Sequence, residues 1–187
     1  LEQTPFLPEK LESGTINTVG IIGLGEIGRK VADVATAFGC NVIYYSTSGR
    51  NANPNYERVG FDELLEKSDI ISIHAPLNEK TNNLINKAAF DKMKNSAVLI
   101  NVGRGPIVNE ADLVDALNEN KIAAAGLDVI SAEPMKRDNP LYGYNDSRRL
   151  IITPHIAWAT NEARQRLVDE AYLNLEAFIH GKERNRV

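Results

Sequence analysis

The sequence has 187 residues, of which 43% are hydrophobic and 25% are charged, with a formal net charge of −4. This length fits one domain, and the composition is typical of a globular protein rather than a disordered one. The charge argues against a nucleic-acid partner, and no apolar run approaches the roughly 18–20 residues of a membrane span. A single cysteine, Cys40, excludes an internal disulfide and favours a reducing compartment such as the cytoplasm.

The first segment, residues 1–17, carries two prolines and shows no sustained hydrophobic period. We interpret it as a leader or linker, and we assign residues 18–187 to one dinucleotide-binding domain. From Thr18 onward, short apolar runs alternate with segments of helical spacing, which is the signature of βαβ units. The sequence therefore predicts an α/β fold with a doubly wound parallel sheet, the Rossmann fold.

Strands are predicted in the short apolar runs, at residues 18–22, 42–45, 69–73, 97–101, within 121–129, and 150–152. Helices are predicted at 27–38, 61–67, 86–93, after Asn109, and along an apolar face from Leu167 to Ile179. Asn109 is predicted to cap its helix, with Asp112 as the partner in a capping box. Cys40 is interpreted as a buried small hydrophobe. Ligands of such sheets bind beyond the carboxyl ends of the strands, so the strand-to-helix loops are the segments to search for chemistry.

The first of these loops, Gly23-Leu24-Gly25-Glu26-Ile27-Gly28, matches the pattern G-x-G-x-x-G. The pattern alone is weak, but here it follows an apolar strand and opens an amphipathic helix. Gly23 would allow the tight turn, Gly25 would let the backbone approach a pyrophosphate, and Gly28 would let helix and strand pack closely. We therefore expect Gly23, Gly25, Glu26, Ile27 and Gly28 to bind a dinucleotide at the helix N-terminus. An ordinary glycine-rich turn is the alternative interpretation.

Three later loops also follow predicted strands, and each contributes one polar side chain: Arg104, Glu133 and His155. A guanidinium can hold a carboxylate as a planar, two-point clamp. An imidazole can supply a proton to a carbonyl oxygen and remove it in the reverse direction. A nearby carboxylate can orient that imidazole and favour its charged form. Together these groups suit the reduction of a 2-oxoacid.

Each of these residues also has a structural interpretation. Arg104 could be a surface turn residue, Glu133 a solvated loop residue, and His155 a histidine with a purely structural role. Their joint placement after separate strands favours an active site. His74, which also follows a strand, is interpreted as structural or cofactor-lining, and His180 as solvent-facing. No metal site is predicted.

The ordered segments GLGEIG, SIHAPLNEKT, NVGRG, LDVISAEP and TPHIAW resemble the D-2-hydroxyacid dehydrogenase family, from Thr18 to Arg184. The resemblance implies that Arg104 binds the substrate carboxylate and that His155 is the acid/base paired with Glu133. It also implies a homodimer and a set of cofactor-lining residues, namely Ala75, Pro76, Thr81, Val102, Gly103, Asp128, His155 and Trp158. The stretch TPHIAWAT is similar to glycerate dehydrogenases (hydroxypyruvate reductases), which hints at a small 2-hydroxy or 2-oxo acid as substrate.

Two departures from the family pattern matter. Almost none of the segment that would form a second, substrate-binding domain precedes the glycine loop, so we expect this chain alone to be incomplete as an enzyme. At the end of the second strand, where NAD-preferring sites place an acid, the sequence has Ser46, followed by Thr47 and then Arg50. Hydroxyls and a guanidinium suit a 2′-phosphate, so we expect NADP preference or dual use. The alternative is a flexible loop in an NAD-using protein.

Two other functions stay open on the sequence alone. The first is a non-catalytic, NAD(H)-sensing module like the corepressors that resemble these dehydrogenases. The second is a plain nucleotide-binding domain that acts on another class of substrate. The presence of Arg104, Glu133 and His155 favours the enzyme over both.

Overall fold

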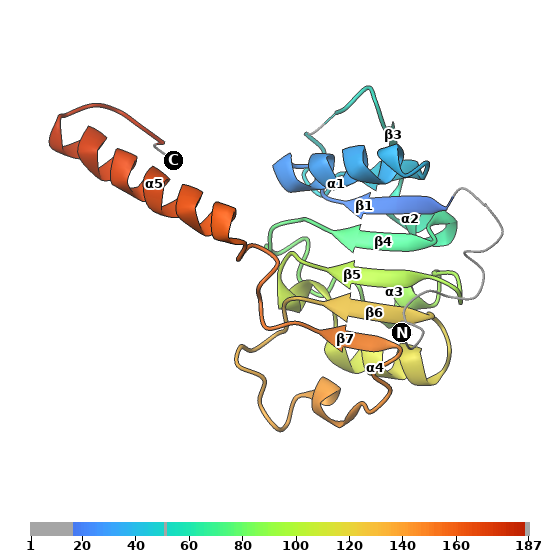
Figure 1. Cartoon of the computed structure of the whole chain (residues 1–187). Helices are drawn as coiled ribbons and strands as arrows, with labels where there is room; N and C mark the ends of the chain where they lie inside the picture. The colour runs from blue at the N-terminus through green and yellow to red at the C-terminus, as the bar shows by residue number, and fades with distance from the viewer. Residues whose placement is uncertain (1–16, 51, 186–187) are drawn as a thin grey trace, which may run out of the picture. The chain divides into compact units, whose positions relative to one another are not determined.

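The structure is a computed structural model that describes residues 17–50 and 52–185, so the predicted leader lies, apart from Asn17, outside the described residues. Its centre is a parallel sheet whose seven strands follow the order β3-β2-β1-β4-β5-β6-β7 (Figure 1). The strands are β1 (Thr18–Ile22), β2 (Asn41–Tyr45), β3 (Glu57–Arg58), β4 (Ile70–Ile73), β5 (Val98–Asn101), β6 (Ala124–Leu127) and β7 (Leu150–Ile152). The predicted α/β class and doubly wound parallel sheet are confirmed.

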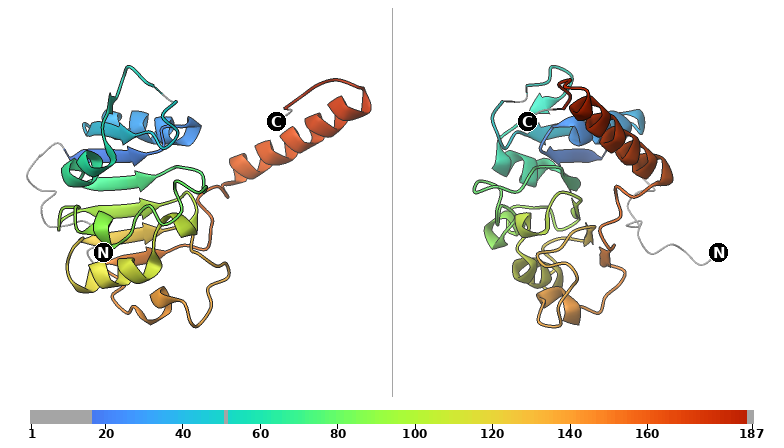
Figure 2. Two further views of the ribbon diagram at one scale, coloured as in Figure 1. Left: turned by 180° about the vertical axis from the view of Figure 1, so that it is seen from behind. Right: turned by 90° about the vertical axis from the view of Figure 1, so that its left-hand side faces the viewer.

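The helices are α1 (Glu26–Ala37), α2 (Phe61–Lys67), α3 (Lys87–Phe90), α4 (Glu110–Asn118) and α5 (Asn161–Ile179). Two short 3₁₀ helices, η2 (Gly105–Ile107) and η3 (Pro140–Gly143), lie in the loops that follow β5 and β6. The strand layer can be followed from behind in the left view of Figure 2.

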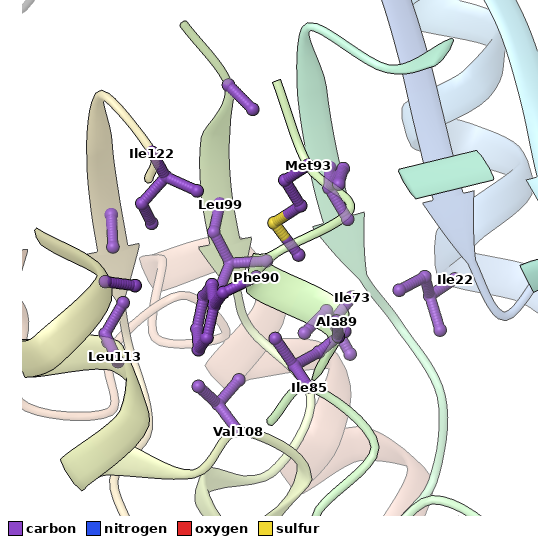
Figure 3. Close-up of a cluster of buried hydrophobic side chains, with 14 of the residues drawn as sticks. Ile22, Ile73, Ile85, Ala89, Phe90, Met93, Leu99, Val108, Leu113 and Ile122 are labelled. Carbon is purple, nitrogen blue, oxygen red and sulfur yellow. The ribbon is translucent and has the colours of Figure 1, made fainter. Parts of the chain in front are cut away.

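Alternating residues of the central strands face two separate hydrophobic clusters, as the pleat of a strand requires. Val19 and Ile21 of β1 pack in a small cluster with Ala32 of α1, whereas Ile22 faces a larger cluster on the other side. The larger cluster includes Phe90 of α3 and Leu113 of α4, and Figure 3 shows part of it. The sheet is therefore covered by α1 on one face and by α2, α3 and α4 on the other.

The strand order places the loops after β1 and β4 at a point where the chain reverses its direction of travel across the sheet. From β1 the chain moves outward to β2 and β3, then returns to β4, which pairs with β1 on its other side. Connections that leave in opposite directions open a crevice at the carboxyl ends of the strands. Any ligand of this sheet is expected in that crevice.

Several predictions about local structure were wrong in detail. The predicted helix 86–93 is the single turn α3, which Asn86 caps by accepting a hydrogen bond from the Ala89 amide at 3.3 Å. Asn109 caps α4 as predicted, accepting from the Asp112 amide at 3.0 Å. Asp112 does not complete a capping box, because its Oδ2 accepts a hydrogen bond from the Lys87 amide at 2.8 Å.

Two further differences concern the edge of the sheet near β2. The two-residue strand β3 was not predicted, because it lacks the run of apolar residues that marks the other strands. Cys40 is half-buried rather than fully buried, and it packs against the small cluster beside Val42. Its thiol is free.

The chain separates into two compact units, one ending at Thr153 and the other beginning at Pro154. The second unit contains α5, whose apolar residues, Leu167 and Phe178 among them, are exposed. The assignment of residues 18–187 to a single domain stays a prediction. Within the described part of the chain, no helix has both the length and the apolar character needed to cross a membrane.

Candidate cofactor and active site

The three glycines of the loop between β1 and α1 play different structural roles. Gly23 has a φ of +93°, and a Cβ added to it would lie 2.8 Å from the Ala75 amide nitrogen. A Cβ on Gly28 would lie 2.2 Å from the Gly23 carbonyl oxygen. A Cβ on Gly25, the N-cap of α1, would meet nothing within 4 Å. Packing therefore requires Gly23 and Gly28, whereas Gly25 leaves open space in front of a helix N-terminus.

A cavity of about 500 Å³ opens at this loop and extends to the ends of β2 and β4. Six of the residues predicted to bind the cofactor line it: Gly23, Gly25, Ser46, Thr47, Arg50 and Pro76. Leu24, Ser48, His74, Asn78, Glu79 and Lys80 line it as well. A dinucleotide fits this chemistry, because helix N–H groups and the open Gly25 suit a pyrophosphate, while the loops after β2 and β4 form the neighbouring walls.

The cavity presents more positive than negative charge. Arg50 and Lys80 are the cations among its lining residues, and Glu79 is the acid. Glu57, the first acid after β2, lies exposed on β3 and is not one of the lining residues. No carboxylate therefore occupies the position at the end of β2 where a ribose hydroxyl would be recognised.

The loop that carries Arg50 is held by several hydrogen bonds. The Gly49 amide donates to Ser46 Oγ at 3.1 Å, and the Arg50 amide donates to Ser48 Oγ at 3.3 Å. Arg58 of β3 donates from Nη1 to the Gly49 carbonyl at 3.1 Å. The loop is thus ordered by its own hydroxyls and by the edge strand β3. In these two bonds the Ser46 and Ser48 hydroxyl oxygens accept, so their O–H groups can donate to a ligand.

His74, just after β4, lines the cavity and also takes part in hydrogen bonds that hold the strand ends together. Its amide donates to the Ile22 carbonyl at 2.8 Å, and its Nε2 lies 2.9 Å from Ser72 Oγ. Burial lowers the pKa of His74 below its ordinary value. The imidazole is therefore neutral at physiological pH and adds no positive charge to the cavity that it lines.

Thr81 was expected to line the cofactor site, but its fully buried side chain serves the fold of the loop after β4. Thr81 Oγ1 donates to the Pro76 carbonyl at 2.6 Å and accepts from the Asn78 amide at 2.8 Å. The Asn78 side chain in turn accepts from the Lys80 amide at 2.9 Å. Thr81 and Asn78 together shape the loop that brings Lys80 to the cavity wall.

Arg104 lies in the loop after β5, and the buried Asn101 holds that loop in shape. Asn101 Oδ1 accepts from the Gly103 amide at 3.0 Å, and its Nδ2 donates to the Arg104 carbonyl at 3.0 Å. The Arg104 side chain is exposed and donates from Nη1 to the Gly103 carbonyl at 2.7 Å. The buried Asn101 side chain thus fixes the backbone of the loop, and this backbone places the Arg104 guanidinium at the surface.

Glu133 lies in the loop after β6, the strand that pairs with β5. Its Oε1 accepts a hydrogen bond from the Ile130 amide at 3.1 Å, and its side chain is exposed. Asp128, at the end of β6, is buried and accepts from Thr153 Oγ1 at 2.5 Å. Since β5 and β6 pair in parallel, Arg104 and Glu133 project from adjacent loops at one edge of the sheet.

His155 and Trp158 belong to the second compact unit. His155 has a φ of +55°, which is uncommon for residues other than glycine, and its carbonyl accepts from Trp158 Nε1 at 2.9 Å. The meeting of His155 with Arg104 and Glu133 stays a prediction. In the described part of the chain, no cluster of His, Cys, Asp and Glu side chains could hold a metal ion.

Residues 9–157 match the sequence model of the family described as D-isomer specific 2-hydroxyacid dehydrogenase, NAD binding domain. The chain belongs to this family. It is 48% identical to the hydroxypyruvate reductase of Blautia hydrogenotrophica over 171 residues, which are 90% of this chain and 52% of that relative. The glycerate dehydrogenase of Methylorubrum extorquens is 42% identical, again over 171 residues, or 91% of this chain and 52% of the relative. This dehydrogenase-family chain therefore spans about half the length of the relatives it matches.

Solved structures of similar proteins agree with the fold. The NAD⁺ complex of D-lactate dehydrogenase from Lactobacillus jensenii has a TM-score of 0.82 at 33% identity, covering 97% of this chain and 58% of the other. An acyclic imino acid reductase in complex with NADPH and D-Arg has a TM-score of 0.82 at 37% identity, covering 92% and 54%. The predicted Rossmann fold is confirmed, and the comparisons give no support to the corepressor alternative.

Of the other predicted cofactor residues in this family member, some lie beside the cavity rather than on its wall. Ala75 is buried next to Gly23, and Gly103 is buried so that an added Cβ would lie 3.0 Å from the Ala75 carbonyl oxygen. Glu26 is exposed and pairs with Arg29, and Ile27 is exposed as well. Glu26, Ile27, Gly28, Ala75, Thr81, Val102, Gly103 and Asp128 are not among the lining residues of this cavity.

Sequence reasoning missed Lys80, Asn78 and Glu79, although the motif that contains them was noted. The available signal was their position, since all three follow β4 at the same sheet edge as the glycine loop. The loop's fold, which depends on Thr81 and Asn78, decides which of its side chains reach the cavity.

Proposed function

We propose that this chain is the cofactor-binding part of an NAD(P)-dependent oxidoreductase that interconverts small D-2-hydroxy acids and 2-oxoacids of the glycerate and glyoxylate class. The observation that carries the proposal is one sheet edge that offers both a cavity of about 500 Å³ at the glycine loop and, on adjacent loops, Arg104 and Glu133. The names of the relatives, hydroxypyruvate reductase and glycerate dehydrogenase, support this substrate class.

Three side chains of this chain would each have a separate role in the reaction. When bound, the nicotinamide cofactor supplies or accepts the hydride. Arg104 holds the substrate carboxylate in two-point contact. His155 gives a proton to the carbonyl oxygen in reduction and takes it back in oxidation, while Glu133 orients the imidazole and stabilises its charged form. A second domain, like the remaining half of the relatives, would close over the substrate and exclude water.

The activity is tested with two forms of the protein. The chain alone is expected to bind dinucleotide but to turn over hydroxypyruvate and glyoxylate poorly. Joined to the substrate domain of the Blautia relative, it is expected to reduce them. In the joined protein, His155→Ala should lower kcat by about 10²–10⁴-fold, as for a positioned acid/base. Arg104→Ala should also raise KM, because it removes substrate binding. Efficient turnover by the chain alone, or wild-type kinetics in both variants, would contradict the proposal.

We further propose that the cofactor site accepts NADPH at least as well as NADH. The support is the absence of a carboxylate at the β2 end of the cavity, where Ser46 stands, and the presence of Arg50 and Lys80 on its walls. A carboxylate at that position would repel a 2′-phosphate, whereas hydroxyls and a guanidinium can donate hydrogen bonds to it.

Fluorescence or calorimetric titration of the chain with both reduced cofactors tests this preference. We expect Kd for NADPH to be comparable to or lower than Kd for NADH. Arg50→Ala is expected to weaken NADPH by about 10-fold, the equivalent of one charge-assisted hydrogen bond, and NADH by much less. Lys92→Ala, which removes a lysine outside the cavity that pairs with Asp62, is the control and should leave both values unchanged. A clear NADH preference that Arg50→Ala does not alter would overturn the proposal.

We also propose that the protein forms a homodimer and is located in the cytoplasm. The free thiol of Cys40 is compatible with a reducing compartment.

A further inference from the structure

One buried carboxylate outside the cofactor cavity has an unusual set of partners. Glu110, the first residue of α4, is only 7% exposed. Its Oε1 accepts from the Ser131 amide at 2.5 Å, and its Oε2 accepts from Ser131 Oγ at 2.6 Å and from Asn139 Nδ2 at 2.8 Å. All three donors come from the loop that follows β6. A buried carboxylate is tolerated only when it is hydrogen-bonded in this way, so Glu110 and this loop depend on each other.

The loop that Glu110 binds is the one that carries Glu133. Ser131 lies two residues before Glu133, and the neighbouring Ile130 amide donates to Glu133 Oε1 at 3.1 Å. The backbone at residues 130–131 therefore helps to fix the position of the Glu133 carboxylate. Glu110 holds that stretch through both the amide and the hydroxyl of Ser131.

The same segment of chain carries Arg104. Arg104 is followed by η2 and then by α4, so Glu110 is six residues further along. A second contact joins the two loops directly, because a Cβ on Gly105 would lie 2.0 Å from the Ile130 carbonyl carbon and 2.5 Å from the Ser131 amide nitrogen. The Arg104 loop and the Glu133 loop are thus fastened at two points, by backbone packing at Gly105 and by hydrogen bonds at Glu110.

We infer that Glu110 is a positioning residue that fixes the loop of Glu133 relative to the loop of Arg104. Glu110 touches neither the cofactor cavity nor the Arg104 side chain; it acts through Ser131 and the backbone next to Glu133. The inference rests on the proposed function to the extent that Glu133 and Arg104 act in one reaction.

A simpler role for Glu110 would be to stabilise α4, since an acid in the first turn of a helix interacts favourably with the helix dipole. Asp112 separates the two roles. It also lies in the first turn of α4, but its carboxylate accepts from the Lys87 amide of α3 instead of from the loop after β6. A helix-stabilising role predicts similar effects of Glu110→Gln and Asp112→Asn, whereas a positioning role predicts different ones.

Hydrogen–deuterium exchange on this chain tests the loop contact without any activity. In Glu110→Gln, one carboxylate oxygen becomes an NH₂ group that faces donors, so amides 130–139 should exchange at least about 10-fold faster, while the amides of β1 and β4 keep their rates. Ser131→Ala removes a donor from the other side and should produce the same local pattern, which guards against a Glu110 variant that fails to fold. Asp112→Asn should leave these amides unchanged. Unchanged exchange of 130–139 in Glu110→Gln and Ser131→Ala would overturn the inference.

Kinetics of the chain joined to a substrate domain test whether the contact serves Glu133. Glu110→Gln is expected to lower kcat for 2-oxoacid reduction by about 10-fold, within the range that misplacement of a catalytic group causes, and to leave KM for the cofactor unchanged. Added to Glu133→Gln, it should lower kcat by less than about twofold more, because the group it positions is already gone. Fully additive losses would overturn the positioning role. If the joined wild-type protein does not turn over 2-oxoacids, the proposed function fails, and the exchange measurement alone decides on Glu110.

Discussion

The two halves of the sheet edge are built in different ways. Around β1, β2 and β4, the cavity depends on glycine backbone and open space at the β1 loop, and hydroxyl and cationic side chains of the β2 and β4 loops form its other walls. Around β5 and β6, buried polar side chains hold the loops: Asn101 binds the backbone of the Arg104 loop, and Glu110 binds the loop of Glu133. A cofactor shared by many proteins can be bound by backbone groups. Side chains that must contact reacting atoms need other side chains that hold them in position. This comparison leads to three predictions.

The largest effect is expected on the β5–β6 side, where the two loops touch through their backbones. In Gly105→Ala, the new methyl would overlap the Ile130 carbonyl, so the loops must separate, at a cost of about 1–3 kcal/mol in the free energy of unfolding. Gly143→Ala, in η3, is the control because its Cβ would meet nothing within 4 Å. Urea denaturation of the chain measures both. Equal stability of Gly105→Ala and the wild type would mean that the two loops are not tightly joined.

The middle effect is expected on the cofactor side. A substitution at Gly25, where an added Cβ meets open space, should lower the affinity for the cofactor and leave the fold nearly as stable. Gly25→Ala places its Cβ in open space at the N-cap of α1. We expect the free energy of unfolding to change by no more than about 0.5–1 kcal/mol, the usual cost of alanine at an N-cap. The affinity for NAD(P)H should fall by at least about 10-fold, because the pyrophosphate must approach the backbone there.

Gly60→Ala is a matched control for this second prediction. Gly60 is also an N-cap, that of α2, and its Cβ would also meet nothing within 4 Å, but it does not line the cavity. It should show the same small change in stability and no change in Kd. If Gly25→Ala bound the cofactor as well as Gly60→Ala does, the glycine loop would not be where the pyrophosphate lies.

The same contrast explains how much could be predicted from the sequence. The sheet and the glycine loop were predictable, since apolar runs such as Thr18–Ile22 and the spacing of Gly23, Gly25 and Gly28 are local patterns with one common structural outcome. Arg104 and Glu133 were predicted as site residues because they follow strands. Their supports were not, because nothing in the residues around Glu110 indicates that its partner is Ser131, 21 positions further along.

The errors have the same origin. Asp112 stands at the right spacing for a capping box, but the Lys87 amide, 25 positions away in sequence, takes its carboxylate. The place of Thr81 in the cofactor site stays a prediction, and in the structure its hydroxyl donates to the Pro76 carbonyl. In each case a contact made only in the folded chain overrides the local pattern, so sequence reasoning locates a loop more reliably than it assigns the partners of its side chains.

The smallest effect is expected from pH and concerns His74, a titratable side chain on the cofactor side of the sheet edge. Burial lowers its pKa below the ordinary 6.5, so as the pH falls the unfolded chain binds a proton before the folded chain does. Stability contributed by the neutral imidazole is therefore present above about pH 6.5 and is lost as the pH falls below that value. Urea denaturation at about pH 7.5 and pH 5.5 should show a larger loss for the wild type than for His74→Asn, which cannot titrate there. His180→Asn, which removes an exposed histidine of the second unit, should keep the wild-type difference. Equal losses in the wild type and His74→Asn would mean that burial does not lower the pKa of His74.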